Sequence, residues 1–218
     1  MDNTVIVSIM SESAAETKSK ILESAKNEFL DKGFMNASLR TIAANAGLTT
    51  GAMYRHFKDK DALFCALVDD AIDVTTKAVM AADVVMHQGE ENPVSEEHHK
   101  KENAILTNLL NYLYANFDAF TLLLTKASGS THENFLDEMC ELYTKNCMKT
   151  FKWFYKQGLA KNAPDEMTVH VIASSLINGF AEIILHKISK RNAIKFVENI
   201  SNLFHYGTIH MMGIPCEE

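Results

Sequence analysis

Residues 38–60 contain the pattern that most constrains how this chain can fold. They read SLRTIAANAGLTTGAMYRHFKDK, two short segments with apolar stripes separated by Gly47. Ser38 can cap the first helix, and glycine can adopt the positive φ at which the chain reverses. The apolar stripe of that first helix is Leu39, Ile42, Ala43 and Ala46. Two short helices joined by a tight turn that contains glycine predict a helix-turn-helix motif.

The second segment predicts a short helix over residues 50–57, capped by Thr49. It buries Met53 and Phe57, which lie one turn apart. Asp59 can then cap a long helix that extends over about residues 59–86.

The exposed side of the second helix has the chemistry of a DNA-reading surface. The second helix of such a motif lies in the major groove. Threonine can contact base edges and thymine methyl groups, whereas tyrosine and histidine can bind phosphates. The residues on this side are Thr50, Gly51, Tyr54, Arg55 and His56. Residues 33–60 have four basic residues and one acidic residue, a net charge of +3, although the whole chain has −7. This distribution favours binding to DNA through one basic face.

Residues 17–68 closely resemble the N-terminal domain of TetR-family transcriptional regulators. The resemblance rests on an apolar first helix that ends at Gly33-Phe34 and on several motifs at fixed spacing. These motifs are Ile42-Ala43, Ala46-Gly47, Tyr54-Arg55-His56-Phe57 and Lys60-Asp61-Ala62-Leu63-Phe64. The resemblance covers about a quarter of the chain.

The resemblance implies an all-α homodimer that binds a double-stranded DNA operator. Three N-terminal helices bind DNA, and a larger helical domain dimerises and holds a small-molecule effector. For this chain we expect a DNA-binding domain at residues 13–60 and a dimerisation and ligand-binding domain at 61–215. The implied DNA contacts are Arg40, Thr49, Thr50, Gly51, Tyr54, His56 and Lys60. Thr50 replaces the larger side chain of many relatives, and residues 1–12 form an extension without a clear pattern.

Composition agrees with an all-α cytoplasmic protein. Three prolines and nine glycines in 218 residues favour long helices over many turns. No uninterrupted apolar run approaches the length that spans a membrane, and the N-terminus does not resemble a signal peptide. The four cysteines have no CxxC spacing, and we expect them to be reduced thiols.

Helical periodicity continues beyond the motif. We expect a loop at residues 87–94 and helices over 95–116 and 117–126. A continuous stripe from Leu136 to Phe154 predicts a helix of about five turns. Two further helices are expected, one starting near Pro164 and the last over residues 193–212. The resemblance implies that these last two helices pair with those of a second chain, and Gly179 can permit close approach there.

Several middle residues are candidates for an apolar ligand pocket, because methionine and aromatic side chains adapt to varied apolar ligands. The candidates are Phe117, Phe120, Met139, Tyr143, Phe151, Phe154 and Asn178. The alternative for each is an ordinary core position.

The sequence has no motif for catalysis, a cofactor or a metal. It lacks a nucleophile elbow, a Walker loop, a dinucleotide fingerprint and HExxH. His98 and His99 are adjacent, and no third ligand has suitable spacing. The favoured function is a ligand-responsive repressor. The alternatives are a ligand-independent DNA-binding scaffold or partner-binding protein, and an enzyme, for which no catalytic residues are present.

Overall fold

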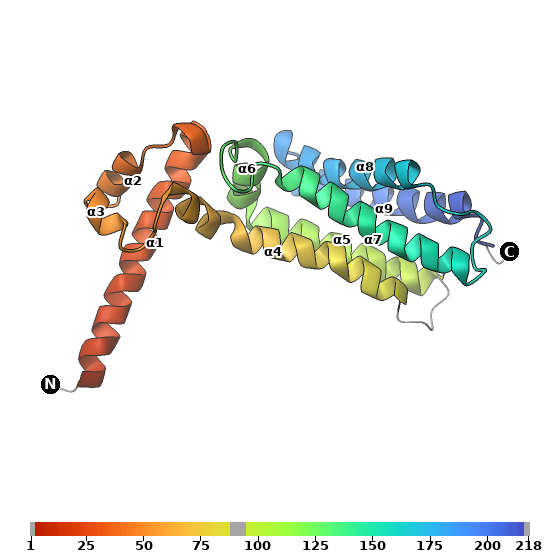
Figure 1. Cartoon of the computed structure of the whole chain (residues 1–218), viewed down its shortest axis with the longest axis horizontal. Coiled ribbons are helices and arrows are strands. Elements are labelled where there is room, and N and C mark those ends of the chain that lie inside the picture. The colour runs from red at the N-terminus through yellow and green to blue at the C-terminus, as the bar shows by residue number, and fades with distance from the viewer. Residues whose placement is uncertain (1–2, 88–94, 216–218) are drawn as a thin grey trace. The chain divides into compact units, whose positions relative to one another are not determined.

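A computed structural model describes residues 3–87 and 95–215 and confirms the all-α prediction. Within these ranges the chain forms nine helices and no strand (Figure 1). The helices are α1 (Asn3–Asn36), α2 (Leu39–Asn45), α3 (Thr50–Met53), α4 (Lys60–His87), α5 (Glu96–Ala115), α6 (Phe117–Thr125), α7 (Phe135–Lys156), α8 (Glu166–Leu185) and α9 (Lys190–Met212).

The helices form two compact units. The first unit comprises Met1–Asp70 and Asp118–Glu133, so α6 and the turn after it pack with the N-terminal helices. The second unit comprises Ala71–Phe117 and Asn134–Glu218. Each unit therefore combines segments that lie far apart in the sequence.

Three phenylalanine rings form the centre of the first unit. Phe64 of α4 packs edge-on against Phe29 and Phe34, with ring centroids 5.2 and 5.3 Å apart. Phe29 and Phe64 are fully buried. Edge-to-face aromatic pairs are favourable beyond the area that they bury. This packing fixes the start of α4 against α1.

The turn after α2 has the geometry that its glycine predicts. Gly47 has φ of 72° and donates its N–H to the Ala44 carbonyl. Leu48 donates to the Ala43 carbonyl at 2.8 Å. Together these two bonds form a Schellman motif, in which the residue after the helix adopts a left-handed conformation.

Two helix boundaries were not predicted from the sequence. The helix predicted over residues 50–57 ends at Met53, because Arg55 and His56 bond to carbonyls only three residues earlier. The resulting turn brings Phe57 into the core. The first helix starts at Asn3, so it includes most of the extension for which the sequence showed no clear pattern, and no glycine or proline interrupts that segment. The predicted loop at 87–94 lies almost wholly outside the described residues.

The predicted stripe of α7 packs into the core of the second unit. Its C-terminal part joins α8 and α9 in one apolar cluster, made of Met148, Phe151, Phe154, Ala160, Val169 and Met212. The packing of α7 against α8 and of α5 against α9 accounts for most of this unit's long-range helix contacts. Gly179 permits a close approach within the chain, since an added Cβ would lie 2.8 Å from the Phe196 ring.

Helix α8 is apolar on both sides. Among the described residues it is the one helix long and apolar enough to cross a membrane. The most apolar 18-residue stretch of this helix has a mean hydropathy of 1.5, and 39% of that stretch is buried. Core helices of soluble proteins also reach such values. The exposed apolar residues on α8 and α9 are Met167, Val171, Leu185, Ile194, Leu203 and Tyr206.

Gly47→Ala is expected to destabilise the first unit by about 1–2 kcal/mol, because a Cβ is unfavourable in the left-handed region. Gly51→Ala is the matched control: Gly51 lies in a helix with no atom within 4 Å of an added Cβ. There alanine is expected to be neutral or stabilising by up to about 1 kcal/mol. Denaturant unfolding of both variants measures the difference, and equal stability would contradict the account of the turn.

Candidate nucleic-acid interface

Side-chain caps fix the starts of α2 and α3. Ser38 Oγ accepts a hydrogen bond from the Thr41 N–H, and the Ser38 N–H donates to Glu28 Oε1 at 3.0 Å. Thr49 Oγ1 accepts from the Ala52 N–H at 3.2 Å. Both bonds satisfy N–H groups that a helix start leaves unpaired. The caps therefore set where the two short helices begin and which residues face solvent.

Most of the predicted DNA contacts lie on an accessible surface of α2 and α3. Arg40, Thr49, Gly51 and Tyr54 are exposed. Thr50 and His56 are half-buried. The position where a Cβ of Gly51 would stand is open, so the backbone itself is accessible to a partner. We call Arg40, Thr49, Gly51 and Tyr54 the exposed face.

Lys60 has a structural role that the sequence did not indicate. Its Nζ donates to the Met35 carbonyl at 3.0 Å and to the Ala37 carbonyl at 3.3 Å. The same ammonium lies 4.8 Å from the centroid of the Phe34 ring. Since an ammonium has three N–H donors, two are committed to the turn between α1 and α2. Lys60 therefore positions the motif, with one donor left for a phosphate.

Two basic side chains beside the exposed face were not among the contacts that the resemblance implied, although the sequence analysis placed one of them, Arg55, on the DNA-reading side. Arg55 is exposed, and the Lys58 side chain is 82% exposed. Its Nζ lies 3.8 Å from Asp59 Oδ2. Their signal in the sequence was the net charge of the motif. Such freely accessible cations suit phosphate contacts.

Asp61 connects the start of α4 to the turn after α6. Its carboxylate accepts hydrogen bonds from the Thr131 N–H, at 2.9 Å, and from the Thr131 hydroxyl. Burial alone would raise the pKa of Asp61, but these bonds outweigh it and lower that pKa. The Phe34 N–H also donates to the Lys126 carbonyl at 2.8 Å. The segment around residues 126–131 thus supports the core beneath the motif.

Comparison with known proteins agrees with this geometry. Residues 21–67 match the family described as bacterial regulatory proteins, tetR family. Over 58 residues the chain is 43% identical to the HTH-type transcriptional repressor BepR of Brucella suis biovar 1 (strain 1330), which is 27% of this chain and 28% of that protein. Over 51 residues it is 49% identical to the HTH-type transcriptional regulator AcrR of Shigella flexneri, 23% of this chain and 24% of that protein.

Over its N-terminal quarter the chain is therefore similar to regulators of the TetR family. The match with the curated relatives spans about a quarter of their length.

Solved structures show that the likeness extends to the overall fold. NalD, the secondary repressor of the MexAB-OprM multidrug efflux pump in Pseudomonas aeruginosa, superimposes with a TM-score of 0.57 at 17% identity, over 87% of this chain and 95% of that one. The fatty acid degradation regulator FadR of Bacillus halodurans gives 0.55 at 15% identity, over 86% and 97%. Identities this low show the fold alone.

The predicted ligand-pocket residues are divided between the two units. Phe151 and Phe154 lie together in the apolar cluster of the second unit. Phe120 is buried in α6 of the first unit, whereas Phe117 contacts the Tyr114 ring in the second. The structure therefore does not bring these four aromatic rings around one site within either unit.

The other three candidates lie on α7 and α8. Met139 is buried. Burial of the Tyr143 hydroxyl raises the pKa of this group well above its usual value. The Asn178 side chain donates to the Ser174 carbonyl at 2.8 Å and lies 3.9 Å from Cys140 Sγ.

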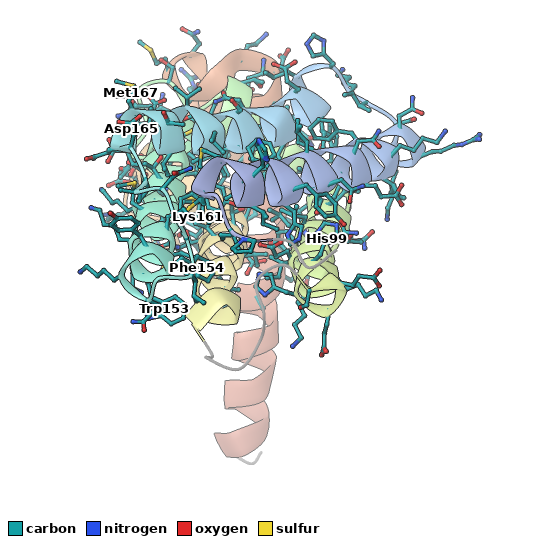
Figure 2. The ribbon with its side chains drawn as sticks, turned by 90° about the vertical axis from the view of Figure 1, so that its right-hand side faces the viewer. His99, Trp153, Phe154, Lys161, Asp165 and Met167 are labelled. Atoms are coloured by element: carbon teal, nitrogen blue, oxygen red, sulfur yellow. The ribbon has the colours of Figure 1, made fainter. Side chains whose placement is uncertain are left out.

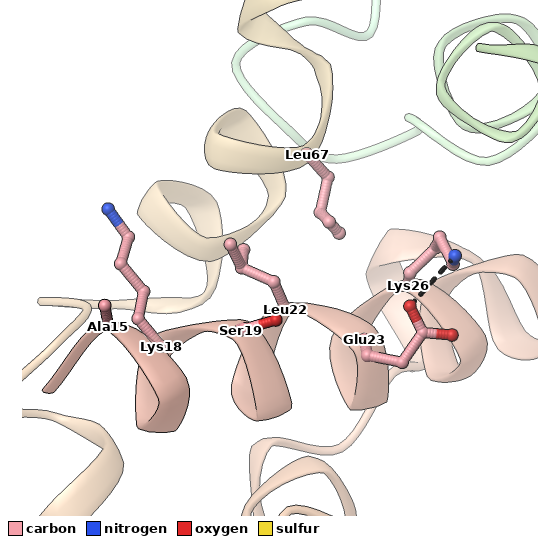
Figure 3. A pocket seen from close by; sticks show the side chains of 7 residues that line it. All are labelled: Ala15, Lys18, Ser19, Leu22, Glu23, Lys26 and Leu67. Atoms are coloured by element: carbon pink, nitrogen blue, oxygen red, sulfur yellow. Dashed lines mark ion pairs between the residues drawn. The ribbon is translucent and has the colours of Figure 1, made fainter. Parts of the chain in front are cut away.

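An open groove lies elsewhere, on the first unit. Its volume is about 410 Å³, and its walls come from α1 and from Leu67 of α4 (Figure 3). Lys26 and Glu23 form an ion pair at 3.0 Å on one side. None of the predicted pocket residues lines this groove.

Two groups of side chains in the described residues have metal-ligand chemistry. One is Cys65, Asp69 and His132 in the first unit, and the other is His99, Glu102 and His205 in the second. The sequence analysis considered His98 and His99 and found no third ligand nearby. The structure adds Glu102, which lies one turn after His99 on α5, and His205 of α9, more than a hundred residues later, which no local spacing could indicate.

Lys60→Met is expected to destabilise this chain by about 1–3 kcal/mol, because the carbonyls of exposed Met35 and buried Ala37 lose a charged donor. Lys58→Met removes the same charge from an exposed site and is expected to change stability by less than about 0.5 kcal/mol. Thermal or denaturant unfolding tests both. If the two variants unfold alike, Lys60 has no positioning role.

Proposed function

We propose that the chain is a cytoplasmic, homodimeric repressor that binds a palindromic DNA operator and leaves it when a small apolar or amphipathic effector binds. Residues 13–60 are the proposed DNA-binding domain, and residues 61–215 the proposed dimerisation and effector domain. The observation that carries the proposal is the exposed face, a capped and accessible helix-turn-helix surface with a bare backbone at Gly51. Repression is the activity named for the relatives BepR and NalD.

DNA recognition would combine backbone and base contacts. Arg40, Arg55 and Lys58 can bind phosphates, which orient a protein on the duplex without reading its sequence. Thr49 and Thr50 can reach base edges in the major groove, and Tyr54 can bind a phosphate. Gly51 lets the start of α3 approach the DNA without a side chain between them. Thr50 and His56, which are half-buried, are supporting rather than principal contacts.

The exposed apolar side chains of α8 and α9 support a homodimer. Val171 is 56% exposed and Leu203 65% exposed, values that favour cover by a second chain. A two-fold interface uses the same surface on both subunits. It would place two α3 helices about one DNA turn, roughly 34–36 Å, or a multiple of it apart. A palindromic operator follows from that symmetry.

An effector can release DNA only if it binds the non-operator conformation more tightly. The adaptable side chains Met139, Tyr143 and Asn178 belong to α7 and α8 of the second unit and are proposed effector contacts there. Phe151 and Phe154, further along α7 in the apolar cluster, are proposed contacts too. Phe117, in the second unit, and Phe120, in α6 of the first, are also proposed effector contacts.

A ligand-independent DNA-binding scaffold or partner-binding protein is the second candidate. The observation that favours it is the packed apolar cluster, in which Phe151 and Phe154 are already buried by protein side chains. DNA affinity measured against a broad panel of apolar compounds separates the two functions. A compound that weakens operator binding supports the effector model, and no response across the panel supports the scaffold.

Gly51→Ala is expected to weaken specific DNA binding at least about tenfold, comparable to the loss of one good base contact. The added methyl group would separate backbone and DNA, although the fold has room for it. The measurement is affinity for a sequence selected from random DNA, with the variant's stability as the control. Unchanged affinity in a folded variant would place the DNA away from α3.

Val171→Glu and Leu203→Glu are each expected to convert the dimer to a monomer and to weaken operator binding by more than about tenfold, since avidity between two half-sites is lost. Tyr155→Glu is the control, because Tyr155 is a 47% exposed aromatic residue on α7 outside the proposed interface. Sedimentation and DNA titration of the three variants test the idea. Dimers that persist in both α8 and α9 variants would exclude this face.

A further inference from the structure

Helices α5 and α9 bring three imidazole rings around one carboxylate. His205 Nδ1 of α9 lies 2.7 Å from Glu102 Oε2 of α5. His99 Nδ1 lies 3.9 Å from the same oxygen, and His98 Nε2 lies 3.5 Å from Glu102 Oε1. Figure 2 shows His99 between the ribbons of α5 and α9. We call His98, His99, Glu102 and His205 the histidine cluster.

The cluster is mostly buried, and two of its ring nitrogens lack hydrogen-bond partners. The His98 side chain is 2% exposed, and that of His205 is 4% exposed. Neither His98 Nε2 nor His99 Nδ1 has a hydrogen-bond partner. A buried polar atom without a partner is unfavourable and uncommon in native proteins. Two such atoms beside one carboxylate therefore call for a binding partner.

Asn202 orients one of these rings for ligation. Its side-chain oxygen lies 2.8 Å from His99 Nε2, and an amide oxygen can only accept a hydrogen bond. The proton of neutral His99 is therefore on Nε2, and the lone pair on Nδ1 is directed to the cluster. Metal-binding histidines have this arrangement, in which the second ring nitrogen donates to a polar group that fixes the tautomer.

Three donor atoms lie close enough to share an ion. One ligand atom each from His99, Glu102 and His205 lies within 4.8 Å of the others. Tetrahedral zinc with bonds of about 2.0–2.2 Å needs ligand atoms about 3.3–3.6 Å apart. Small side-chain rotations would supply the difference. Binding also requires that the His205 proton move from Nδ1 to Nε2.

We propose that His99, Glu102 and His205 bind a divalent transition-metal ion, with Zn²⁺ as the best match, and that water occupies the fourth position. Two imidazoles and one carboxylate are a known zinc donor set. His98 Nε2 then donates to Glu102 Oε1 and orients the ligating carboxylate. The ion would fasten α9 to α5 within the second unit, a role separate from DNA recognition.

The other group is a poorer candidate. Burial and the nearby carboxylates raise the pKa of the Cys65 thiol to about 11, and metal ligation requires the thiolate. The Asp69 side chain is also 64% exposed. The histidine cluster has neither disadvantage.

The test uses the untagged full-length protein, freed of metal with a chelator. Titration with Zn²⁺ by calorimetry and with Co²⁺ by visible absorption is expected to saturate at one ion per chain. Zn²⁺ is also expected to raise the melting temperature. Glu102→Gln and His99→Ala are each expected to weaken binding by more than about 100-fold, and Asn202→Ala, which keeps all three ligands, by about 10- to 100-fold.

His186→Ala is the matched control, because His186, at the C-terminal end of α8, forms an exposed pair with Glu182 at 2.8 Å. It is expected to leave metal affinity unchanged. Far-UV circular dichroism confirms that each variant is folded, and Asn202→Ala keeps the test decisive if a ligand variant does not fold. Absence of saturable binding, or binding that the Glu102, His99 and Asn202 variants leave unchanged, would overturn the proposal and leave a hydrogen-bonded cluster.

Discussion

The packing of Phe64 between Phe29 and Phe34 is the contact on which the proposed DNA surface depends. It fixes the start of α4 against the end of α1, and Lys60 stands at that start with its ammonium on the Met35 and Ala37 carbonyls. These bonds fix the turn between α1 and α2. The Ser38 cap then sets the start of α2, and Gly47 sets the turn that leads to α3. A rigid support of this kind lets a recognition element as short as α3 present a defined surface.

The sequence predicted the motif well because its signals are local. A capping serine, a glycine at positive φ and apolar residues at helical spacing each act within a few residues, and all three agree at 38–48. The end of α3 was predicted wrongly for the opposite reason. Residues 54–56 have acceptable helix propensity, but the need to bury Phe57 favours a turn, and that need comes from the tertiary core.

Long-range features were beyond such signals. Nothing near residue 126 indicates that α6 and its following turn pack in the first unit, or that Thr131 bonds to Asp61. The resemblance predicted Lys60 as a DNA contact. In the structure its ammonium bonds to the Met35 and Ala37 carbonyls, which lie more than twenty residues earlier in the sequence. The histidine cluster is the same case: His98 and His99 had no visible third ligand until α9 placed His205 beside Glu102. Gly179 was expected at a contact between chains, and it meets Phe196 of its own chain.

The central claim is that the exposed face of α2 and α3 reads a specific DNA sequence as part of a two-fold dimer. Selection of binding sites from a random-sequence DNA pool, followed by titration of the selected site at several salt concentrations, tests it most directly. The account predicts a palindromic sequence whose half-sites are separated by about one helical turn or a multiple, bound with an affinity that falls steeply with salt. Failure to enrich any sequence, or enrichment of a site without two-fold symmetry, would contradict it.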